Sequence, residues 1–146
     1  MNIEEIKTNF AFVGESTYHN SIQIGSNEQM CDLYIESSKG NINPEQIVVY
    51  NQFIENYSTI LNAVQRHLID NIPQKFEYQT TEVRDAKLVP EIINVPFSQE
   101  NYDLVLVFGI KLKWFLFLKK DYGFRVELKQ GKIQSLVFKN DTTTPN

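Results

Sequence analysis

Cysteine and histidine are scarce in this chain of 146 residues, which has one cysteine and two histidines. A single cysteine cannot form an internal disulfide, and three such residues cannot fill the usual tetrahedral zinc sites. No residue beside Cys31 indicates a lowered thiol pKa, so a buried thiol in a reducing compartment is a better interpretation than a nucleophile. We therefore expect no metal and no other cofactor.

Signal peptides and membrane-spanning segments are also missing from the sequence. The first ten residues, MNIEEIKTNF, are acidic and contain no apolar run of signal-peptide length. The most apolar stretch near the carboxyl terminus is interrupted by Lys111, Lys113, Lys119 and Lys120. These absences predict a cytoplasmic protein that has no membrane partner.

Recognisable catalytic motifs are missing as well. The six glycines have neither P-loop nor dinucleotide-binding spacing. No carboxylate lies in an apolar run that would raise its pKa for acid–base catalysis. His19 with Ser16 or Ser21 and Asp32 could form a nucleophilic arrangement, but such a site requires a geometry that spacing alone does not provide. We therefore predict that the protein is not an enzyme.

The composition is typical of one globular domain, with 42% hydrophobic and 22% charged residues. We expect a single domain over residues 1–139 and a disordered polar tail over residues 140–146.

The net charge of −4 argues against general nucleic-acid binding, but the charge is unevenly distributed. Residues 1–101 contain fourteen acidic and six basic residues, whereas residues 102–146 contain four acidic and eight basic residues. Either the two halves pair across the fold, or the basic half meets an acidic partner.

One long amphipathic helix is predicted over residues 43–71. Apolar side chains recur there at steps of three and four residues, which places them on one helix face. The stripe comprises Ile47, Tyr50, Ile54, Tyr57, Leu61, Val64 and Leu68, with Phe53 and Ile60 at its margins. Asn43 can cap the first turn, Pro44 suits the first helical position, and Gln46 lies where a capping-box partner reaches back.

Short strands are predicted on both sides of this helix. Before it, alternating patterns indicate strands at 10–13, 18–24 and 30–36. After it, residues 73–99 are irregular, with weaker strand patterns at 76–81 and 91–97. The strongest patterns follow, at 104–108, 111–118, 124–129 and 132–138, with tight turns at 121–123 and 130–131.

These elements predict an α+β fold. Its antiparallel β-sheet, formed by three N-terminal strands and a C-terminal four-stranded meander, would pack against one long central helix. In this arrangement Phe115 and Phe117 lie on the far face of the sheet. The 73–99 segment, a second copy in a homodimer or a ligand would have to cover them.

A basic and aromatic surface is the strongest candidate site, and we predict that it binds a partner. Its residues are Lys111, Lys113, Phe115 and Phe117 on one predicted strand, with Arg125 and Lys129 on the next. Interleaved basic groups and rings are typical of single-stranded nucleic-acid platforms. The alternative places the two phenylalanines in the core with lysines at its rim. The acidic remainder of the chain favours this alternative.

Three segments carry a resemblance to known proteins. They are CDLYIE at the end of the third predicted strand, NPEQIVVYNQFIEN at the helix start, and YDLVLVFGIKLKWFLFLKKDYGFRVELKQGKIQSL in the closing strands. In this order they resemble a group of small uncharacterised bacterial α+β domains, some of whose relatives are immunity proteins of polymorphic toxin systems. The resemblance implies neutralising binding of a toxin or another protein, and it contains no functional motif.

Three functions stay open on the sequence alone. The first is a non-enzymatic protein-binding module of the cytoplasm. The second is a small-ligand binder or cryptic enzyme with a pocket between helix and sheet, lined by Tyr50, Tyr57 and Trp114. The third is a weak single-stranded nucleic-acid binder that uses the basic and aromatic surface.

Overall fold

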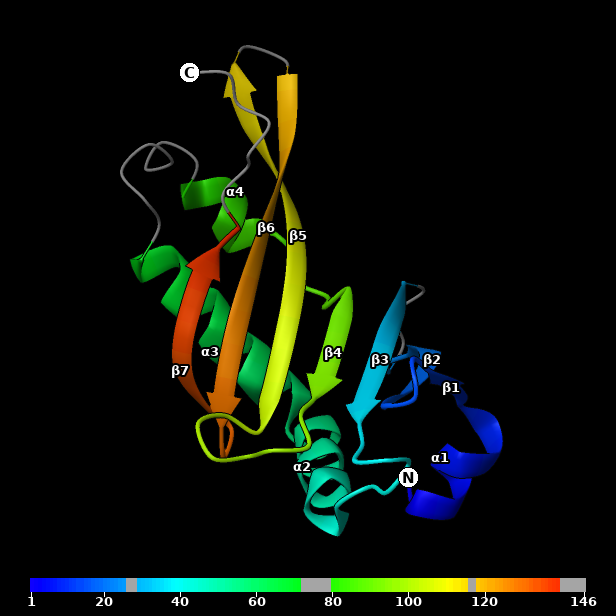
Figure 1. Cartoon of the computed structure of the whole chain (residues 1–146). Helices are drawn as coiled ribbons and strands as arrows, with labels where there is room; N and C mark the ends of the chain where they lie inside the picture. Colours follow the sequence, from blue (N-terminus) through cyan, green and yellow to red (C-terminus); the bar gives the residue numbers. More distant parts are fainter. Residues whose placement is uncertain (26–28, 72–79, 116–117, 140–146) are drawn as a thin grey trace.

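The computed structural model describes residues 1–25, 29–71, 80–115 and 118–139, without the side chains of residues 80–82, 112–115 and 118–120 (Figure 1). Its helices are α1 (Ile3–Asn9), α2 (Pro44–Glu55), α3 (Tyr57–Asp70) and α4 (Thr80–Asp85). Its strands are β1 (Ala11–Val13), β2 (Thr17–Gln23), β3 (Met30–Glu36), β4 (Ile92–Val95), β5 (Leu104–Phe115), β6 (Leu118–Lys129) and β7 (Lys132–Phe138). No helix in these ranges is long and apolar enough to cross a membrane.

All seven described strands form one sheet, in the order in which they occur along the chain. Neighbours are antiparallel except β3 and β4, which are parallel. Parallel neighbours need a long crossover connection, and here that connection contains α2, α3 and α4. The predicted antiparallel sheet is therefore wrong. The sheet is mixed, because β4 lies between the N-terminal hairpins and the C-terminal meander and pairs with both.

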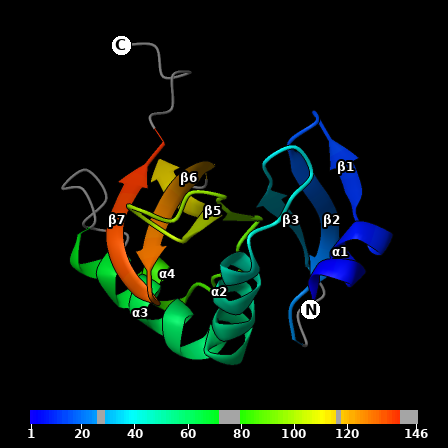
Figure 2. The ribbon, with the colours of Figure 1, turned by 60° about the horizontal axis from the view of Figure 1, so that its bottom comes forward.

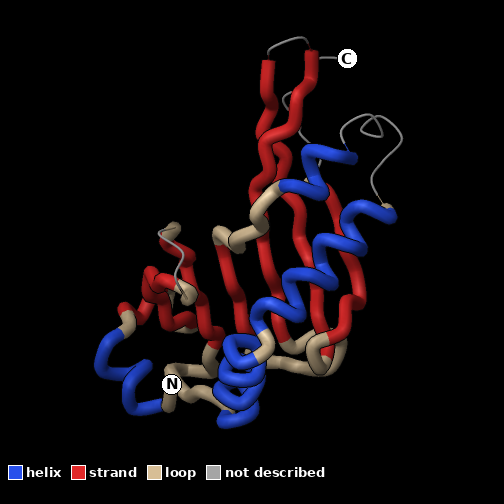
Figure 3. Tube along the Cα trace, turned by 180° about the vertical axis from the view of Figure 1, so that it is seen from behind, coloured by secondary structure: helices blue, strands red, loops and turns tan. Residues whose placement is uncertain are grey.

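The predicted single long central helix is also wrong, because the helix breaks at Asn56. Both the backbone N–H and the side-chain Nδ2 of Asn56 donate to the carbonyl of Gln52, at 3.0 and 2.8 Å. Side-chain bonds of this kind compete with helix continuation. The axis changes direction at this point (Figure 3). As a result α2 contacts β4 and α3 contacts β7, so the two helices follow a sheet that twists between these strands.

The C-terminal meander has three described strands rather than the four that were predicted. The predicted strand 104–108 and residues 111–115 of the predicted strand 111–118 run together in β5, while residues 116–117 lie outside the described residues and Leu118 begins β6. The predicted turn 121–123 lies inside β6, where Gly123 pairs with Gly109. Neither glycine ends its strand. Instead, each leaves room for another side chain to lie across the ladder, since an added Cβ would clash with Glu91 at Gly109 and lie 3.2 Å from Lys139 at Gly123.

Several local predictions are confirmed. The three N-terminal strands form β1 to β3, and residues 91–97 contain β4. The turn at Gln130 and Gly131 has φ angles of 50° and 74° and joins β6 to β7. The predicted strand at 76–81 and the predicted tail at 140–146 fall largely or wholly outside the described residues, and within the former Thr80 begins α4.

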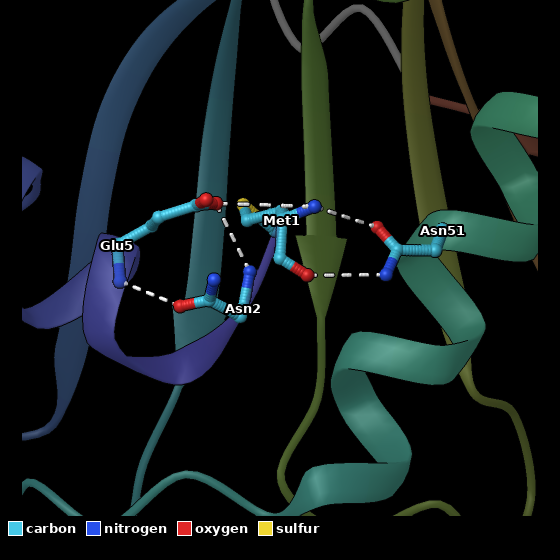
Figure 4. A network of polar contacts seen from close by, with 4 residues as sticks. All are labelled: Met1, Asn2, Glu5 and Asn51. Atoms are coloured by element: carbon cyan, nitrogen blue, oxygen red, sulfur yellow. Dashed lines mark hydrogen bonds and ion pairs between the residues drawn. The ribbon is translucent and has the colours of Figure 1, made fainter.

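Helix α1 was not predicted, and Figure 4 shows how it is attached to α2. Asn51 Nδ2 donates to the carbonyl of Met1 at 3.1 Å, while the Met1 amino group donates to Asn51 Oδ1 at 3.3 Å. Asn2 and Glu5 form a reciprocal capping box at the start of α1. These polar contacts follow no periodic pattern in the sequence, and they add to the burial of Ile6 of α1 in the hydrophobic core.

The hydrophobic core lies between the helices and one face of the sheet. Figure 2 shows α2 between the two wings of the sheet, β1 to β3 and β5 to β7. Phe53, Val64 and Leu68 from the helices and Phe108 and Phe124 from the sheet are all buried there. The break at Asn56 changes the buried stripe, so that Phe53 is 2% exposed whereas Ile54 is 36% exposed. Cys31 is buried, as predicted.

Candidate protein-binding surface

The face of the sheet opposite the helices, which we call the outer face, is uncovered over much of its width within the described residues (Figures 1 and 3). Strand register aligns one residue from each of six strands across it. We call this set the central row. It consists of Ser21, Asp32, Ile92, Val107, Arg125 and Val137.

The N-terminal end of the central row is polar. Asp32 Oδ1 accepts a hydrogen bond from Ser21 Oγ at 2.8 Å and lies 3.0 Å from His19 Nε2. These bonds, that of His19 first and then that of Ser21, lower the pKa of Asp32 below its ordinary value. The His19 ring also stacks on Tyr34, with ring centroids 4.6 Å apart. The cluster therefore presents an ionised carboxylate with two ordered neighbours.

The cluster does not have the geometry of a catalytic triad. In a triad the histidine lies between the serine and the acid, so that it can remove the hydroxyl proton. Here Ser21 and His19 both contact the same oxygen of Asp32. The serine hydroxyl donates directly to a carboxylate whose pKa is lowered, and such a carboxylate is a weak base. Ser16, the other serine considered, contacts Thr17 instead.

A second carboxylate on the outer face ties β3 to β4 and to the loop that follows. Glu36 Oε1 accepts from Asn94 Nδ2 at 2.9 Å, and Glu36 Oε2 accepts from the backbone N–H of Phe97 at 3.2 Å. Both acids of this region are therefore held in place by hydrogen bonds rather than free to rotate.

Near its other end, next to the terminal Val137, the central row carries the basic residue Arg125. Arg125 Nη2 donates to Glu127 Oε1 at 3.0 Å, and the guanidinium carbon lies 5.7 Å from the centre of the Tyr102 ring. Tyr102 precedes β5 in the loop that crosses the lower end of the outer face (Figure 1). Val105, which faces outward, is buried there although it lies outside the main core cluster. The loop therefore covers only one corner of the face.

Three of the six predicted partner-binding residues share the outer face. Lys111 is exposed and its Nζ is 4.0 Å from Asp121 Oδ1, Arg125 lies in the central row, and Lys129 donates to the carbonyl of Gln99. Lys113 and Phe115 belong to β5, but their side chains are not described. Phe117 lies outside the described residues. The predicted basic and aromatic surface therefore stays a prediction, of which the described side chains cover Lys111, Arg125 and Lys129.

The sequence interpretation missed the apolar centre of the row, Ile92 and Val107. The alternating pattern in 30–36 places Asp32 on the exposed face. No local pattern shows that β4 brings Ile92 between Asp32 and Val107, since that contact depends on the parallel pairing of β3 and β4.

The predicted ligand pocket was assigned to Tyr50, Tyr57 and Trp114. Tyr50 lies in the hydrophobic core and is 9% exposed, whereas Tyr57 lines a hollow of about 350 Å³. The side chain of Trp114 is not described. In the described part of the chain, no group of three or more His, Cys, Asp or Glu residues is placed to hold a metal ion.

Comparison with known proteins adds no relative. No family model, curated protein or solved structure matches this chain.

Proposed function

We propose that this protein is a non-enzymatic, cytoplasmic protein-binding module, and that it binds its partner through the outer face of the sheet. One observation carries the proposal. In the central row, the apolar side chains of Ile92 and Val107 lie between Asp32 on one side and Arg125 on the other, in register across four strands.

The chemistry of the row suits a protein surface. Interfaces between proteins have an apolar centre with a polar rim, and complementary charges orient the two partners. Ile92 and Val107 are half-buried, and Val137 at the far end is 59% exposed. A complementary partner would place a basic group against Asp32 and an acidic group near Arg125. The contacts that hold Arg125 and Asp32 reduce the entropy lost on binding.

Nucleic acid is a poorer candidate for the same face. Asp32, Glu36 and Glu127 all lie on it and would repel a phosphate backbone. The basic groups are already in contact with neighbours, Arg125 with Glu127 and Lys129 with the Gln99 carbonyl. A phosphate would have to displace these contacts.

The partner class that the sequence favours is a protein toxin. The support is the resemblance to bacterial domains that have immunity proteins among their relatives, which is an argument by analogy. Neutralisation by such a protein requires a stable complex, and an extended face with an apolar centre provides for one.

Two variants and a control test the proposal. The protein is co-expressed with the product of a neighbouring toxin-like gene, and the complex is measured by size-exclusion chromatography with light scattering and by calorimetry. We expect a stoichiometric complex that Arg125→Glu and Val107→Lys each weaken at least tenfold. Ile54→Lys, on exposed helix surface, should not weaken it. Circular dichroism confirms folding of each variant, and Arg125 is exposed, so its substitution is the safer of the two.

The proposal is wrong if no complex forms with such a product, or if both outer-face variants bind as tightly as the original chain. A dimer of the chain itself that Arg125→Glu disrupts would also overturn it, because the outer face would then be a self-association surface.

A further inference from the structure

A pocket of about 490 Å³, which we call the junction pocket, lies where α2 and α3 meet the end of the sheet. Its walls include Phe53, Ile60, Leu104 and Leu128, which are apolar, and Thr59 and Asp103, which are polar. A neighbouring hollow of about 590 Å³ shares Val49, Gln52, Asp103 and Gln130 with it. This size is typical of small-molecule sites and larger than a single side chain requires.

Asp103 is the polar group at the centre of this region. It is 5% exposed and lines both hollows. Its Oδ2 accepts from the backbone N–H of Gln130 at 2.8 Å, and its own N–H donates to the carbonyl of Leu128 at 2.9 Å. Its other oxygen has no hydrogen bond from the residues that the structure describes. Because Asp103 lines both hollows, this oxygen can accept a hydrogen bond from a molecule that enters them.

The charges of the surrounding residues favour a positively charged ligand. Glu55 lines the junction pocket, and Glu45 and Glu100 line the neighbouring hollow. Among the described residues of these walls the one basic residue is Lys129, which lines the neighbouring hollow, and its ammonium group donates to the carbonyl of Gln99. Excess negative charge around a partly desolvated site attracts a cation and disfavours an anion.

We propose that the junction pocket binds a small aliphatic amine, whose ammonium group pairs with the free oxygen of Asp103. The carbon chain of the amine lies against Phe53, Ile60 and Leu128, and the outer carboxylates add a long-range attraction. This site is separate from the outer face, since none of the central-row residues lines it. It therefore does not depend on the proposed protein-binding function.

Three ligands of equal chain length test the charge requirement: pentylamine, pentan-1-ol and pentanoate. We expect calorimetry and protein NMR to show saturable one-to-one binding of pentylamine, at least tenfold tighter than binding of either of the other two. Asp103→Asn keeps an acceptor oxygen for the Gln130 N–H but removes the charge, and it should weaken pentylamine binding at least tenfold. Asp70→Asn, an exposed acid at the end of α3, should not.

A second pair of variants tests the location without altering Asp103. Thr59→Phe fills the exposed wall of the junction pocket and should abolish binding, whereas Ser58→Phe, one residue earlier on α3 and not part of this pocket, should leave it unchanged. The proposal is wrong if pentylamine shows no saturable binding, if pentan-1-ol binds equally well, or if neither Asp103→Asn nor Thr59→Phe weakens binding. The proposal is also wrong if Asp103→Asn abolishes the complex with a protein partner while the original chain shows no binding of pentylamine.

Discussion

The Nε2 amide of Gln46 donates to the carbonyl of Val95 at 3.0 Å, beneath the first turn of α2. The same nitrogen donates to the carbonyl of Glu36 at 2.9 Å, and the side-chain oxygen accepts from the backbone N–H of Asn43 at 2.9 Å. Gln46 is fully buried. A single side chain thus completes the capping box of α2 and joins the ends of the two parallel strands.

Replacing Gln46 by leucine should therefore destabilise the protein severely. Three hydrogen bonds of about 0.5–1.5 kcal/mol each are lost, so we expect the free energy of unfolding to fall by about 2–4 kcal/mol. Urea denaturation followed by circular dichroism measures the change. Gln52→Leu on the same helix is the matched control, because Gln52 is exposed and should change stability by less than about 0.5 kcal/mol. Equal effects of the two substitutions would contradict the bridging role of Gln46.

The adjacent residues Phe53 and Ile54 test the helix break at Asn56. Phe53 is 2% exposed in the core, and Phe53→Ala should cost about 3–5 kcal/mol. Ile54 is 36% exposed, and Ile54→Ala should cost less than about 1 kcal/mol. Chemical denaturation provides both values. A continuous helix would bury Ile54, so a larger loss at Ile54 than at Phe53 would refute the two-helix arrangement.

Stability should decrease at alkaline pH, because burial raises the pKa of Cys31 and the pKa of Tyr50 to about 12 each. The unfolded chain loses these protons near pH 9 and 10, whereas the folded chain holds them. Their contribution is therefore fully present below about pH 8.5 and is lost as the pH rises toward 12, by up to about 1.4 kcal/mol per pH unit for each group. Urea unfolding between pH 7 and 10.5 measures the slope.

Tyr50→Phe and Cys31→Val should each make this alkaline slope shallower, since each removes one of the two titrating groups. The comparison uses the change in unfolding free energy between pH 8 and pH 10.5, so that any packing effect of the substitution itself cancels. Slopes identical to that of the original chain would show that these groups do not control alkaline stability.

The pKa of Asp32 should depend on its two hydrogen-bond donors. Bonds from His19 and Ser21 lower it, so Ser21→Ala should raise it toward the ordinary value of an aspartate. A lowered pKa in the folded state stabilises the fold at pH values above the pKa that Asp32 has in the unfolded chain. This contribution is lost as the pH falls through the folded-state pKa. Carbon-detected NMR titration of the carboxylate measures the pKa directly. Ser58→Ala on α3 should leave it unchanged.

Features that depend on neighbouring residues in the chain could be predicted from the sequence. The capping box of Asn43 and Gln46, the alternation of 30–36 and the turn at Gln130 and Gly131 are of this kind. Their energies come from bonds and sterics within a few residues, and amino-acid type alone specifies them. The same reasoning placed Asp32 on an exposed strand face, but it could not identify what lies beside it.

Features that depend on distant residues were decided only by the tertiary structure. The apolar stripe from Ile47 to Leu68 is compatible with one continuous helix. In the structure two helices, which meet at Asn56, follow the twist of the sheet. In the sequence, Gly109 is compatible with the end of a strand. In the structure it pairs with Gly123 in the middle of the β5–β6 ladder. No local pattern in the sequence predicts the parallel pairing of β3 with β4, which assembles the central row. Its partners are more than fifty residues apart, and only the packing of the whole chain brings them into register.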